Sequence, residues 1–377
     1  ILLGHLASIN SIAFTAGGRL LLSGSDDQTV RVWDVASGWC VRVIEGYGLI
    51  CFGVVWSPDG RSLLSANSDM TLTIWDVAAG APRLTLRGHT HTVYGVAWSP
   101  NGQQVASSGF DQTVRIWDAQ SGVCLRIIPA HTDTIYRVAW WSPDGRWLAS
   151  AGRDQAVRVL ELPLGRSRWV GRGHTGPIND VMWSPDGQRL VSCGEDRTVR
   201  LWRAGDGLLL QTFSGHQSSV AGVAWSPDGR HLASCGAGGG LVELFLWDAE
   251  RGERIQSLVG HDSVVSRVAW SRDGKRLFSG GMAGVIGWWD VESGANLYMR
   301  QAHQGWLRSL SVSPDGSTLV SSGEDGVIHL WSIERADLMR TLRIDRPYER
   351  MNLRGLTGVS QAQRAALMAL GALERGA

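Results

Sequence analysis

Short runs of alternating apolar and polar residues, separated by turn residues, fill most of the 377-residue chain. One stretch shows the pattern clearly: a run at 93–98 is followed by Ser-Pro-Asn-Gly at 99–102, and a run at 114–117 alternates apolar and polar positions. Proline presets the backbone of a turn and glycine tolerates positive φ, so this tetrapeptide predicts a tight hairpin. Further runs at 104–107, 114–117 and 123–128 predict three more strands with short turns between them. The pattern therefore predicts a small four-stranded antiparallel sheet.

The same pattern recurs about every 42 residues and gives eight copies. Three columns of residues mark the copies. A Gly-His or Ala-His pair opens most of them, Ser-Pro-Asp-Gly or a variant forms the first turn, and Trp-Asp or a relative ends the third strand. One small sheet cannot bury both of its faces, so neighbouring copies must stack. The repeat therefore predicts an all-β propeller.

On these three columns the chain resembles the WD40 repeat family over residues 4–344. The resemblance implies a closed β-propeller with its blades around a central channel. The column count favours a single ring of eight four-stranded blades over residues 1–344, and seven blades plus an extra repeat are the alternative. Residues 1–4 and 338–344 occupy the same strand position, so either end of the repeat region can supply the closing strand.

The aligned copies share a set of His, Ser, Asp and Trp residues. Serine, histidine and aspartate together invite a hydrolase interpretation, but a nucleophile needs one uniquely activated copy, whereas this set recurs. In the WD40 family these positions form a hydrogen-bonded tetrad within a blade. We expect that structural role for four complete sets: His5, Ser23, Asp27 and Trp33; His89, Ser107, Asp111 and Trp117; His174, Ser192, Asp196 and Trp202; His303, Ser321, Asp325 and Trp331.

Other copies depart from the set. Copy two has Tyr47 in place of the histidine, and copy four has Leu160 in place of the tryptophan. Copies six and seven lack the turn aspartate, because copy six carries a glycine-rich insertion at 236–240 and copy seven has Ala283. These two copies are expected to be the softer ones.

The family resemblance implies that partners dock on the top face, around the channel mouth. The positions concerned lie five residues after the His column and one residue before the turn aspartate. In copies two to four they carry aromatic residues and arginine, the residue types that dominate interface hot spots, although ordinary packing against neighbouring strands is the alternative. With two residues of copy eight, the predicted partner-binding residues are Phe52, Tyr94, Phe110, Tyr136, Arg153, Trp306 and Arg308.

Composition narrows the classes of function. The 36 basic and 35 acidic side chains give a net charge of +1, which argues against a polybasic nucleic-acid binder. No apolar run approaches the length of a membrane span. The five cysteines are scattered and form no C-x-x-C pair, which argues against a zinc knuckle and favours a reducing, cytoplasmic setting. We therefore expect no catalytic residue, no metal and no cofactor.

The end of the chain departs from the repeat. Residues 345–377 form a tail, in which Ser360 can cap a short helix over about 361–370. The tail resembles the ending of bacterial proteins that carry WD40 repeats behind a signalling NTPase of the NB-ARC or NACHT type. That resemblance implies that the chain is the C-terminal sensing part of such a protein, with the upstream domains as partners. The missing initial methionine agrees with a fragment.

The leading hypothesis is a non-enzymatic scaffold or sensor that binds a protein or peptide. A catalytic or small-ligand site in the central channel is one alternative, and a nucleic-acid-associated scaffold is another. A non-repeating cluster of polar residues around the channel would favour the first alternative, and a basic face would favour the second.

Lys275 is the one lysine among 36 basic residues, a bias that we attribute to genome composition.

Overall fold

The computed structural model describes residues 9–14, 20–25, 29–37, 40–45, 50–237 and 242–342. The regular structure of these residues is entirely β, and the helix expected at about 361–370 lies outside the described residues. The chain divides into two compact units, one of which is Ile50–Arg343.

The smaller unit contains one four-stranded antiparallel sheet, which corresponds to the first sequence copy. Its strands pair in chain order: β1 (Ile9–Phe14), β2 (Leu20–Ser25), β3 (Thr29–Asp34) and β4 (Cys40–Glu45). The first copy therefore supplies all four strands of its own sheet.

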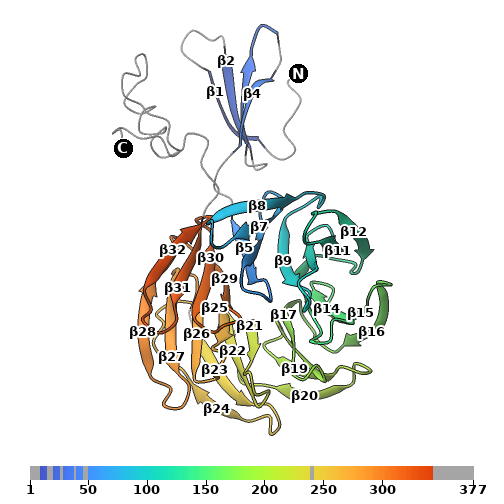
Figure 1. Ribbon diagram of the computed structural model, residues 1–377, viewed down its shortest axis with the longest axis vertical. Helices are drawn as coiled ribbons and strands as arrows, with labels where there is room; N and C mark the ends of the chain where they lie inside the picture. Colours follow the sequence, from blue (N-terminus) through green and yellow to red (C-terminus); the bar gives the residue numbers. More distant parts are fainter. Residues whose placement is uncertain are drawn as a thin grey trace. The chain divides into compact units, whose positions relative to one another are not determined.

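The larger unit is a ring of seven such sheets around a centre (Figure 1). We name them blades 1 to 7 in chain order. Blades 1 and 2 comprise β5 (Cys51–Trp56), β6 (Ser62–Asn67), β7 (Leu72–Asp76), β8 (Ala81–Leu86), β9 (Val93–Trp98), β10 (Gln104–Gly109), β11 (Thr113–Asp118) and β12 (Cys124–Pro129). Blades 3 and 4 comprise β13 (Ile135–Trp141), β14 (Trp147–Gly152), β15 (Ala156–Glu161), β16 (Arg166–Arg172), β17 (Ile178–Trp183), β18 (Arg189–Gly194), β19 (Val199–Arg203) and β20 (Leu209–Phe213).

Blades 5, 6 and 7 complete the ring. Their strands are β21 (Ser219–Trp225), β22 (His231–Ala237), β23 (Glu243–Asp248), β24 (Arg254–Ser257), β25 (Val265–Trp270), β26 (Arg276–Gly281), β27 (Val285–Asp290), β28 (Asn296–Gln301), β29 (Leu307–Val312), β30 (Thr318–Gly323), β31 (Ile328–Ser332) and β32 (Leu338–Leu342). Each blade is built from four consecutive strands, so every blade of the ring is continuous in the chain.

The ring closes where blade 7 meets blade 1, although these two blades are not consecutive in the chain. The inner strand β29 packs beside β5. Ser309 Oγ accepts a hydrogen bond from the Val54 N–H at 3.1 Å, and Ser322 Oγ donates to the Cys51 carbonyl at 3.0 Å. The favoured ring of eight blades is therefore wrong in its count, and the alternative of seven blades plus an extra repeat describes the structure. Packing and hydrogen bonds alone hold this junction, which we call the seam.

Two glycines of blade 2 show why the turns have their sequence. Gly102 ends the Ser-Pro-Asn-Gly turn with a φ of 70°, and its N–H donates to the Ser99 carbonyl at 2.9 Å. A side chain would strain that conformation. Gly109 meets a different need, because a Cβ there would lie 2.2 Å from the Thr92 carbonyl oxygen. Glycine at this position therefore allows the two backbone segments to approach closely.

The hydrophobic core lies between neighbouring blades. Leu64 and Ile74 of blade 1 belong to one buried cluster with Val105 and Trp117 of blade 2, and each of these side chains is at most 4% exposed. Similar clusters join the other described blades around the ring. Burying a large apolar side chain stabilises a fold by about 1.5–3 kcal/mol. Each blade therefore depends on its neighbours, as the repeat pattern predicted.

Arginines on outer strands also connect neighbouring blades. Each donates from its guanidinium to a backbone carbonyl of the next blade, at 2.6–3.2 Å: Arg83 to Ala119, Arg126 to Leu164, Arg168 to Gly205, Arg300 to Ala336, and Arg340 to Val77, Ala78 and Ala79. A guanidinium carries five N–H donors and suits this bridging better than an ammonium. Part of the arginine excess thus has a structural role that the sequence analysis did not foresee.

Candidate functional site

The repeated His, Ser, Asp and Trp residues form a hydrogen-bonded chain inside a blade, and blade 2 shows it in full. His89 Nδ1 lies 2.8 Å from Asp111 Oδ2, and His89 Nε2 lies 2.7 Å from Ser107 Oγ. Trp117 Nε1 donates to the same Ser107 Oγ at 2.7 Å. The chain therefore ties together the segment before β9, strand β10, the β10–β11 turn and strand β11.

The donors and acceptors of this chain determine where its protons lie. An indole N–H can only donate, and an ionised carboxylate can only accept. Ser107 Oγ therefore accepts from Trp117 and directs its own proton to His89 Nε2, which leaves the His89 Nδ1 proton for Asp111. Each group in the buried chain has a partner, and a fully satisfied network of this kind stabilises a fold.

The network also holds its aspartates ionised. Burial raises the pKa of Asp111, but the hydrogen bond and electrostatic attraction of His89, together with a hydrogen bond from Thr113, outweigh it and bring that pKa well below its usual range. The same balance of burial against a neighbouring histidine lowers the pKa of Asp154 and of Asp196.

The other predicted sets have different outcomes. Two repeat the hydrogen bonds of blade 2: His174, Ser192, Asp196 and Trp202 in blade 4, and His303, Ser321, Asp325 and Trp331 in blade 7. For the first copy, His5 and Asp27 lie outside the described residues, as do the side chains of Ser23 and Trp33.

Blade 5 contains a carboxylate that the sequence analysis missed. The turn aspartate is absent from this copy, but Glu243 on β23 takes its place, with Oε2 at 3.2 Å from His216 Nδ1. Glu243 also accepts from the Gln217 and Ser218 N–H groups, at 2.7 and 3.1 Å. Glu243 lies four residues before Trp247, whereas the turn aspartates lie six residues before their tryptophans, which is why counting along the sequence did not find it.

Blade 6 has no such substitute. His261 Nε2 bonds Ser279 Oγ at 2.7 Å, and no carboxylate among the described residues bonds its other nitrogen. Burial lowers the pKa of His261 to about 4, against a small opposing effect of Asp262. His261 is therefore neutral at pH 7, and blade 6 relies on a shorter network.

The serines of these networks are poorly placed for catalysis. Ser107, Ser192 and Ser321 have no measurable exposure. A nucleophile must reach its substrate, and its oxygen must be free to attack. Here each serine oxygen already bonds a histidine and a tryptophan. The geometry therefore offers no accessible triad at these positions.

The non-repeated residues gather elsewhere, at one mouth of the central channel. A cavity of about 530 Å³ is lined there by Phe52, Tyr94, Asn179, Glu195, Ser219, Ala221, Ser266, Arg267, Trp306 and Arg308. Most of these residues lie near the start of an inner strand, and they come from six of the seven blades. Four of the seven predicted partner-binding residues, Phe52, Tyr94, Trp306 and Arg308, thus line a single cavity.

The aromatic wall of this cavity spans the seam. The rings of Phe52 and Tyr94 meet edge to face, with centroids 4.8 Å apart. The Arg308 guanidinium lies 4.1 Å from the Trp306 ring centroid and 5.5 Å from that of Phe52, and it pairs with Glu324. Stacking on two rings and an ion pair hold this arginine in place. The side chains thus form a preorganised surface of three rings and one cation.

The opposite wall is small and polar. Asn179 Nδ2 donates to Ser219 Oγ at 3.0 Å and to the Val220 carbonyl at 2.9 Å. Arg267 donates to the carbonyls of Arg308, Ala221 and Ser266 at 2.6–3.2 Å, and so fixes the backbone around the mouth. Arg267 could not be predicted from the sequence, because it follows the marked position of its copy by one residue and belongs to no column.

The remaining predicted contact residues do not line the cavity. Phe110 is 45% exposed and packs on His91, with ring centroids 4.7 Å apart. Arg153 lies on the surface and makes a 4.0 Å pair with Asp133. Tyr136 lies in β13, and its side chain is outside the described part of the chain.

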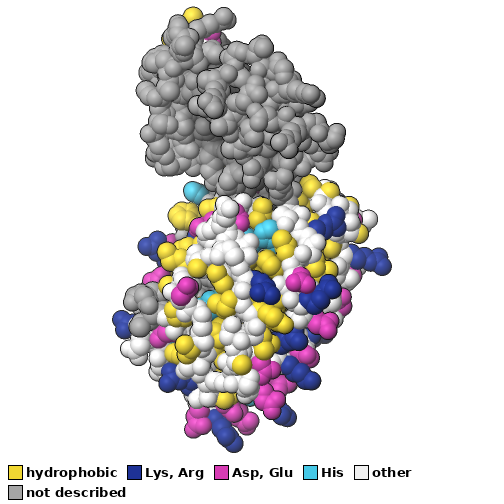
Figure 2. Space-filling view, turned by 90° about the vertical axis from the view of Figure 1, so that its left-hand side faces the viewer, with side chains coloured by type: hydrophobic (Ala, Val, Ile, Leu, Met, Phe, Trp, Pro, Cys, Tyr) yellow, Lys and Arg dark blue, Asp and Glu magenta, His cyan; other side chains and the backbone are white. Residues whose placement is uncertain are grey.

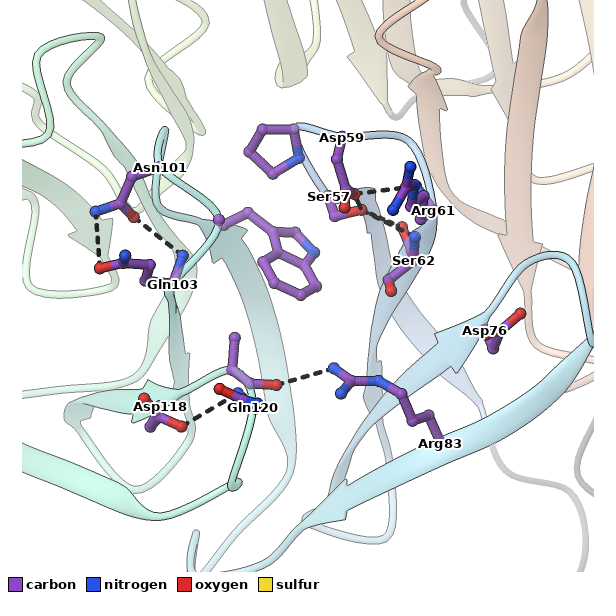
Figure 3. Close-up of a pocket in the computed structure, with 14 residues that line it drawn as sticks. Ser57, Asp59, Arg61, Ser62, Asp76, Arg83, Asn101, Gln103, Asp118 and Gln120 are labelled. Atoms are coloured by element: carbon purple, nitrogen blue, oxygen red, sulfur yellow. Dashed lines mark hydrogen bonds between the residues drawn. The ribbon is translucent and has the colours of Figure 1, made fainter.

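Further cavities lie between neighbouring blades. The one between blades 1 and 2 has a volume of about 610 Å³, and Figure 3 shows its polar lining. Its carboxylates already serve turns: Asp59 accepts from the Arg61 N–H at 3.0 Å, and Asp118 accepts from the Gln120 N–H at 3.1 Å. Arg83 spans the groove to the next blade. A similar groove between blades 2 and 3 carries the same turn motif, so we interpret these cavities as products of the repeat.

Among the described residues, one group combines histidines and a carboxylate in a way that suits a metal. His303, Asp325 and His329 of blade 7 each bring one ligand atom within 4.8 Å of the others.

The four cysteines whose side chains are described are free thiols: Cys51, Cys124, Cys193 and Cys235. No helix in the described part of the chain has the length and hydropathy that a membrane span requires.

Comparison with known proteins gives short matches to curated relatives. The chain is 40% identical over 57 residues to a ribosome biogenesis protein BOP1 homolog of Drosophila persimilis, which is 15% of this chain and 7% of the relative. It is 51% identical over 41 residues to the BOP1 homolog of Monosiga brevicollis, 11% of this chain and 5% of that protein. A match to nuclear distribution protein nudF 1 of Talaromyces marneffei is 46% identical over 46 residues, 12% of this chain and 10% of the relative. The chain thus spans a tenth or less of the length of these relatives, and none of these names points to a signalling NTPase.

The family comparison covers most of the chain, up to residue 332. The model of the WD domain, G-beta repeat, matches residues 1–34, 38–76, 80–118, 122–160, 165–203, 207–242, 252–290 and 294–332. The number of these segments agrees with the eight copies counted in the sequence, and each of the last seven begins with the outer strand of one sheet and continues into the inner strands of the next. With its His-Ser-Asp-Trp networks and its closed propeller, the chain belongs to the WD40 repeat family.

Proposed function

We propose that this propeller is a non-enzymatic interaction module that binds a protein partner, through an extended peptide segment, at the channel mouth. The observation that carries the proposal is the convergence of Phe52, Tyr94, Trp306 and Arg308 on one cavity. These side chains stand at positions that vary among the copies, whereas the repeated residues are buried in networks. WD40 propellers are typically protein-interaction scaffolds, which supports the same assignment.

The chemistry of the mouth favours a peptide with an apolar or aromatic side chain. Such a side chain would pack on the Phe52 and Tyr94 rings, whose edge-to-face contact leaves both partly exposed. Aromatic residues and arginine contribute most of the binding energy at many interfaces. Asn179, Ser219 and Glu195 on the opposite wall offer polar groups to the peptide backbone.

The two alternatives have less support. For catalysis, the hydroxyls in the described lining are engaged: Ser219 with Asn179, and Ser266 with the Leu307 carbonyl at 3.4 Å. For nucleic acid, the face drawn in Figure 2 interleaves basic, acidic and hydrophobic side chains rather than gathering the basic ones. A stripe of cations would be needed for strong phosphate binding.

Two further parts of the proposal depend on the sequence more than on the fold. The free thiols support a reducing, cytoplasmic setting. The link to an upstream signalling NTPase depends on residues 345–377, which lie outside the described residues, and it stays a prediction.

The test is a peptide selection on the intact chain. A random peptide library is panned on the wild-type protein, and the affinities of the selected peptides are measured for three proteins: wild type, Tyr94→Ala and Tyr298→Ala. Tyr298 is a matched control, because it is 37% exposed on the outer strand β28 of blade 6. We expect at least a tenfold loss of affinity for Tyr94→Ala and none for Tyr298→Ala. Equal affinities for all three proteins would refute the proposed site.

A further inference from the structure

A cluster of potential metal ligands lies in blade 7, apart from the channel mouth. His303 precedes β29, Asp325 lies in the turn between β30 and β31, and His329 is on β31. The three residues are distant in sequence, but the fold brings one ligand atom of each within 4.8 Å of the others. The rings of His303 and His329 lie with centroids 4.9 Å apart and a 38° angle between their planes.

His329 is what distinguishes blade 7 from the other blades whose histidine bonds a turn aspartate. Four residues after the turn aspartate, blades 2, 3 and 4 carry Arg115, Arg158 and Arg200, each of which pairs with that aspartate. Blade 7 has an imidazole there instead. A guanidinium can only donate, whereas a neutral imidazole presents a lone pair. The substitution therefore turns a position that neutralises the carboxylate into one that can share a cation with it.

The hydrogen bonds around the cluster orient its ligands. His329 Nδ1 bonds Thr341 Oγ1 at 2.8 Å, which leaves its Nε2 as the ligand nitrogen. His303 Nδ1 faces Asp325 Oδ1 at 2.9 Å, and His303 Nε2 bonds Ser321 Oγ at 2.8 Å. Metal-bound histidines ordinarily direct their second nitrogen to such an outer partner. The Asp325 side chain is 17% exposed, so water can reach the group.

We propose that His303, Asp325 and His329 form a binding site for a divalent cation of the zinc class. Two imidazole nitrogens and one carboxylate oxygen are a common ligand set for zinc, with water in the fourth position. The cation takes the place of the proton that His303 Nδ1 donates to Asp325, and the imidazole stays neutral because this proton is exchanged, through water, for one on Nε2. His303 then donates from Nε2 to Ser321 Oγ, which still accepts from Trp331 at 3.0 Å.

Binding requires one local adjustment. Bonds near 2.1 Å in a tetrahedral site set the ligand atoms about 3.4 Å apart. The present separations reach up to 4.8 Å. His329 is the ligand that moves, because it is half-buried whereas His303 is only 1% exposed.

The test uses the intact chain, freed of metal with a chelator and titrated with zinc chloride by calorimetry. We expect one zinc ion per chain and a higher unfolding temperature on addition of zinc. His329→Arg restores the residue that blades 2 to 4 have, so it should keep the fold and lose at least tenfold in zinc affinity. If that variant unfolds, His329→Gln provides the same comparison.

A gain-of-function control sharpens the result. Arg200→His in blade 4 places a second histidine beside His174 and Asp196, in the arrangement of blade 7, and should add a second zinc ion per chain. The proposal is overturned if the wild type binds no zinc at micromolar concentrations. It is also overturned if His329→Arg binds zinc as tightly as the wild type, because the ion would then be held by other histidines.

Discussion

The network of blade 4 and the channel mouth both gather polar and aromatic side chains, but in different surroundings. In blade 4, His174, Ser192 and Trp202 are at most 5% exposed, and they bond one another and Asp196. At the mouth, Phe52 and Tyr94 are partly exposed and contact each other across two blades. The first arrangement recurs around the ring, whereas the second occurs once. Repeated residues therefore build this propeller, and the residues that differ between copies form the surface that we propose as the binding site.

The largest loss of stability is expected when the carboxylate is removed from a network. Asp196→Ala leaves His174 Nδ1 and the Thr175 N–H without their acceptor. Leaving a buried donor without its acceptor typically costs about 1–3 kcal/mol of unfolding free energy. Denaturant titration should show that loss. Asp206→Ala serves as the control in the same blade, because Asp206 pairs with Arg203 on the surface, and we expect no measurable change. Equal losses in both variants would contradict the structural role of the network.

Lowering the pH should reduce the unfolding free energy through His261 in blade 6. The pKa of His261 is about 4 in the fold against 6.5 for an ordinary histidine, so the unfolded chain takes up a proton first as the pH falls. Above pH 6.5 His261 is neutral in both the folded and the unfolded chain, and the unfolding free energy keeps its full value. As the pH falls from 6.5 to 4, proton uptake by His261 in the unfolded chain lowers the unfolding free energy by about 3 kcal/mol. Unfolding free energies measured across this window should decline less steeply in His261→Gln. An unchanged slope would contradict the assignment.

The comparison also extends to the blade junctions. At the seam, Arg340 donates to three carbonyls of blade 1, whereas Arg83 makes one such bond where a linker already joins blades 1 and 2. Arg340→Ala should cost about 1–2 kcal/mol of unfolding free energy, and Arg83→Ala less than about 1 kcal/mol. Thermal unfolding of the two variants side by side provides the measurement. A larger loss for Arg83→Ala would show that the linked junction, rather than the seam, limits stability.

The smallest effect on stability is expected at the mouth. Tyr94→Ala removes a partly exposed ring, so the unfolding free energy should change by less than about 1 kcal/mol. The contrast with Asp196→Ala is the informative quantity, and denaturant titration of both variants gives it. A loss as large as that of Asp196→Ala would mean that Tyr94 belongs to the core.

The sequence predicted those features that depend on local periodicity. The four-stranded copies, the turn around Gly102 and the hydrogen-bonding role of His89, Ser107, Asp111 and Trp117 all follow from residue types at fixed spacing. The number of blades in the ring did not follow, because ring closure depends on how β29 packs against β5, and the columns carry no information on that contact. Glu243 and His329 were missed for a related reason. Glu243 stands outside the column of the turn aspartates, and His329 acts through neighbours that are close only in the folded chain.

The most direct test of the central claim is photo-crosslinking with a benzophenone side chain at residue 52 or residue 298 of the intact chain. In an extract that contains the partner, position 52 should yield a crosslinked protein that excess unlabelled wild type competes away and excess Tyr94→Ala does not. Position 298, on the outer rim, should yield none. Crosslinks from position 298 alone, or equal competition by Tyr94→Ala, would contradict a binding site at the channel mouth.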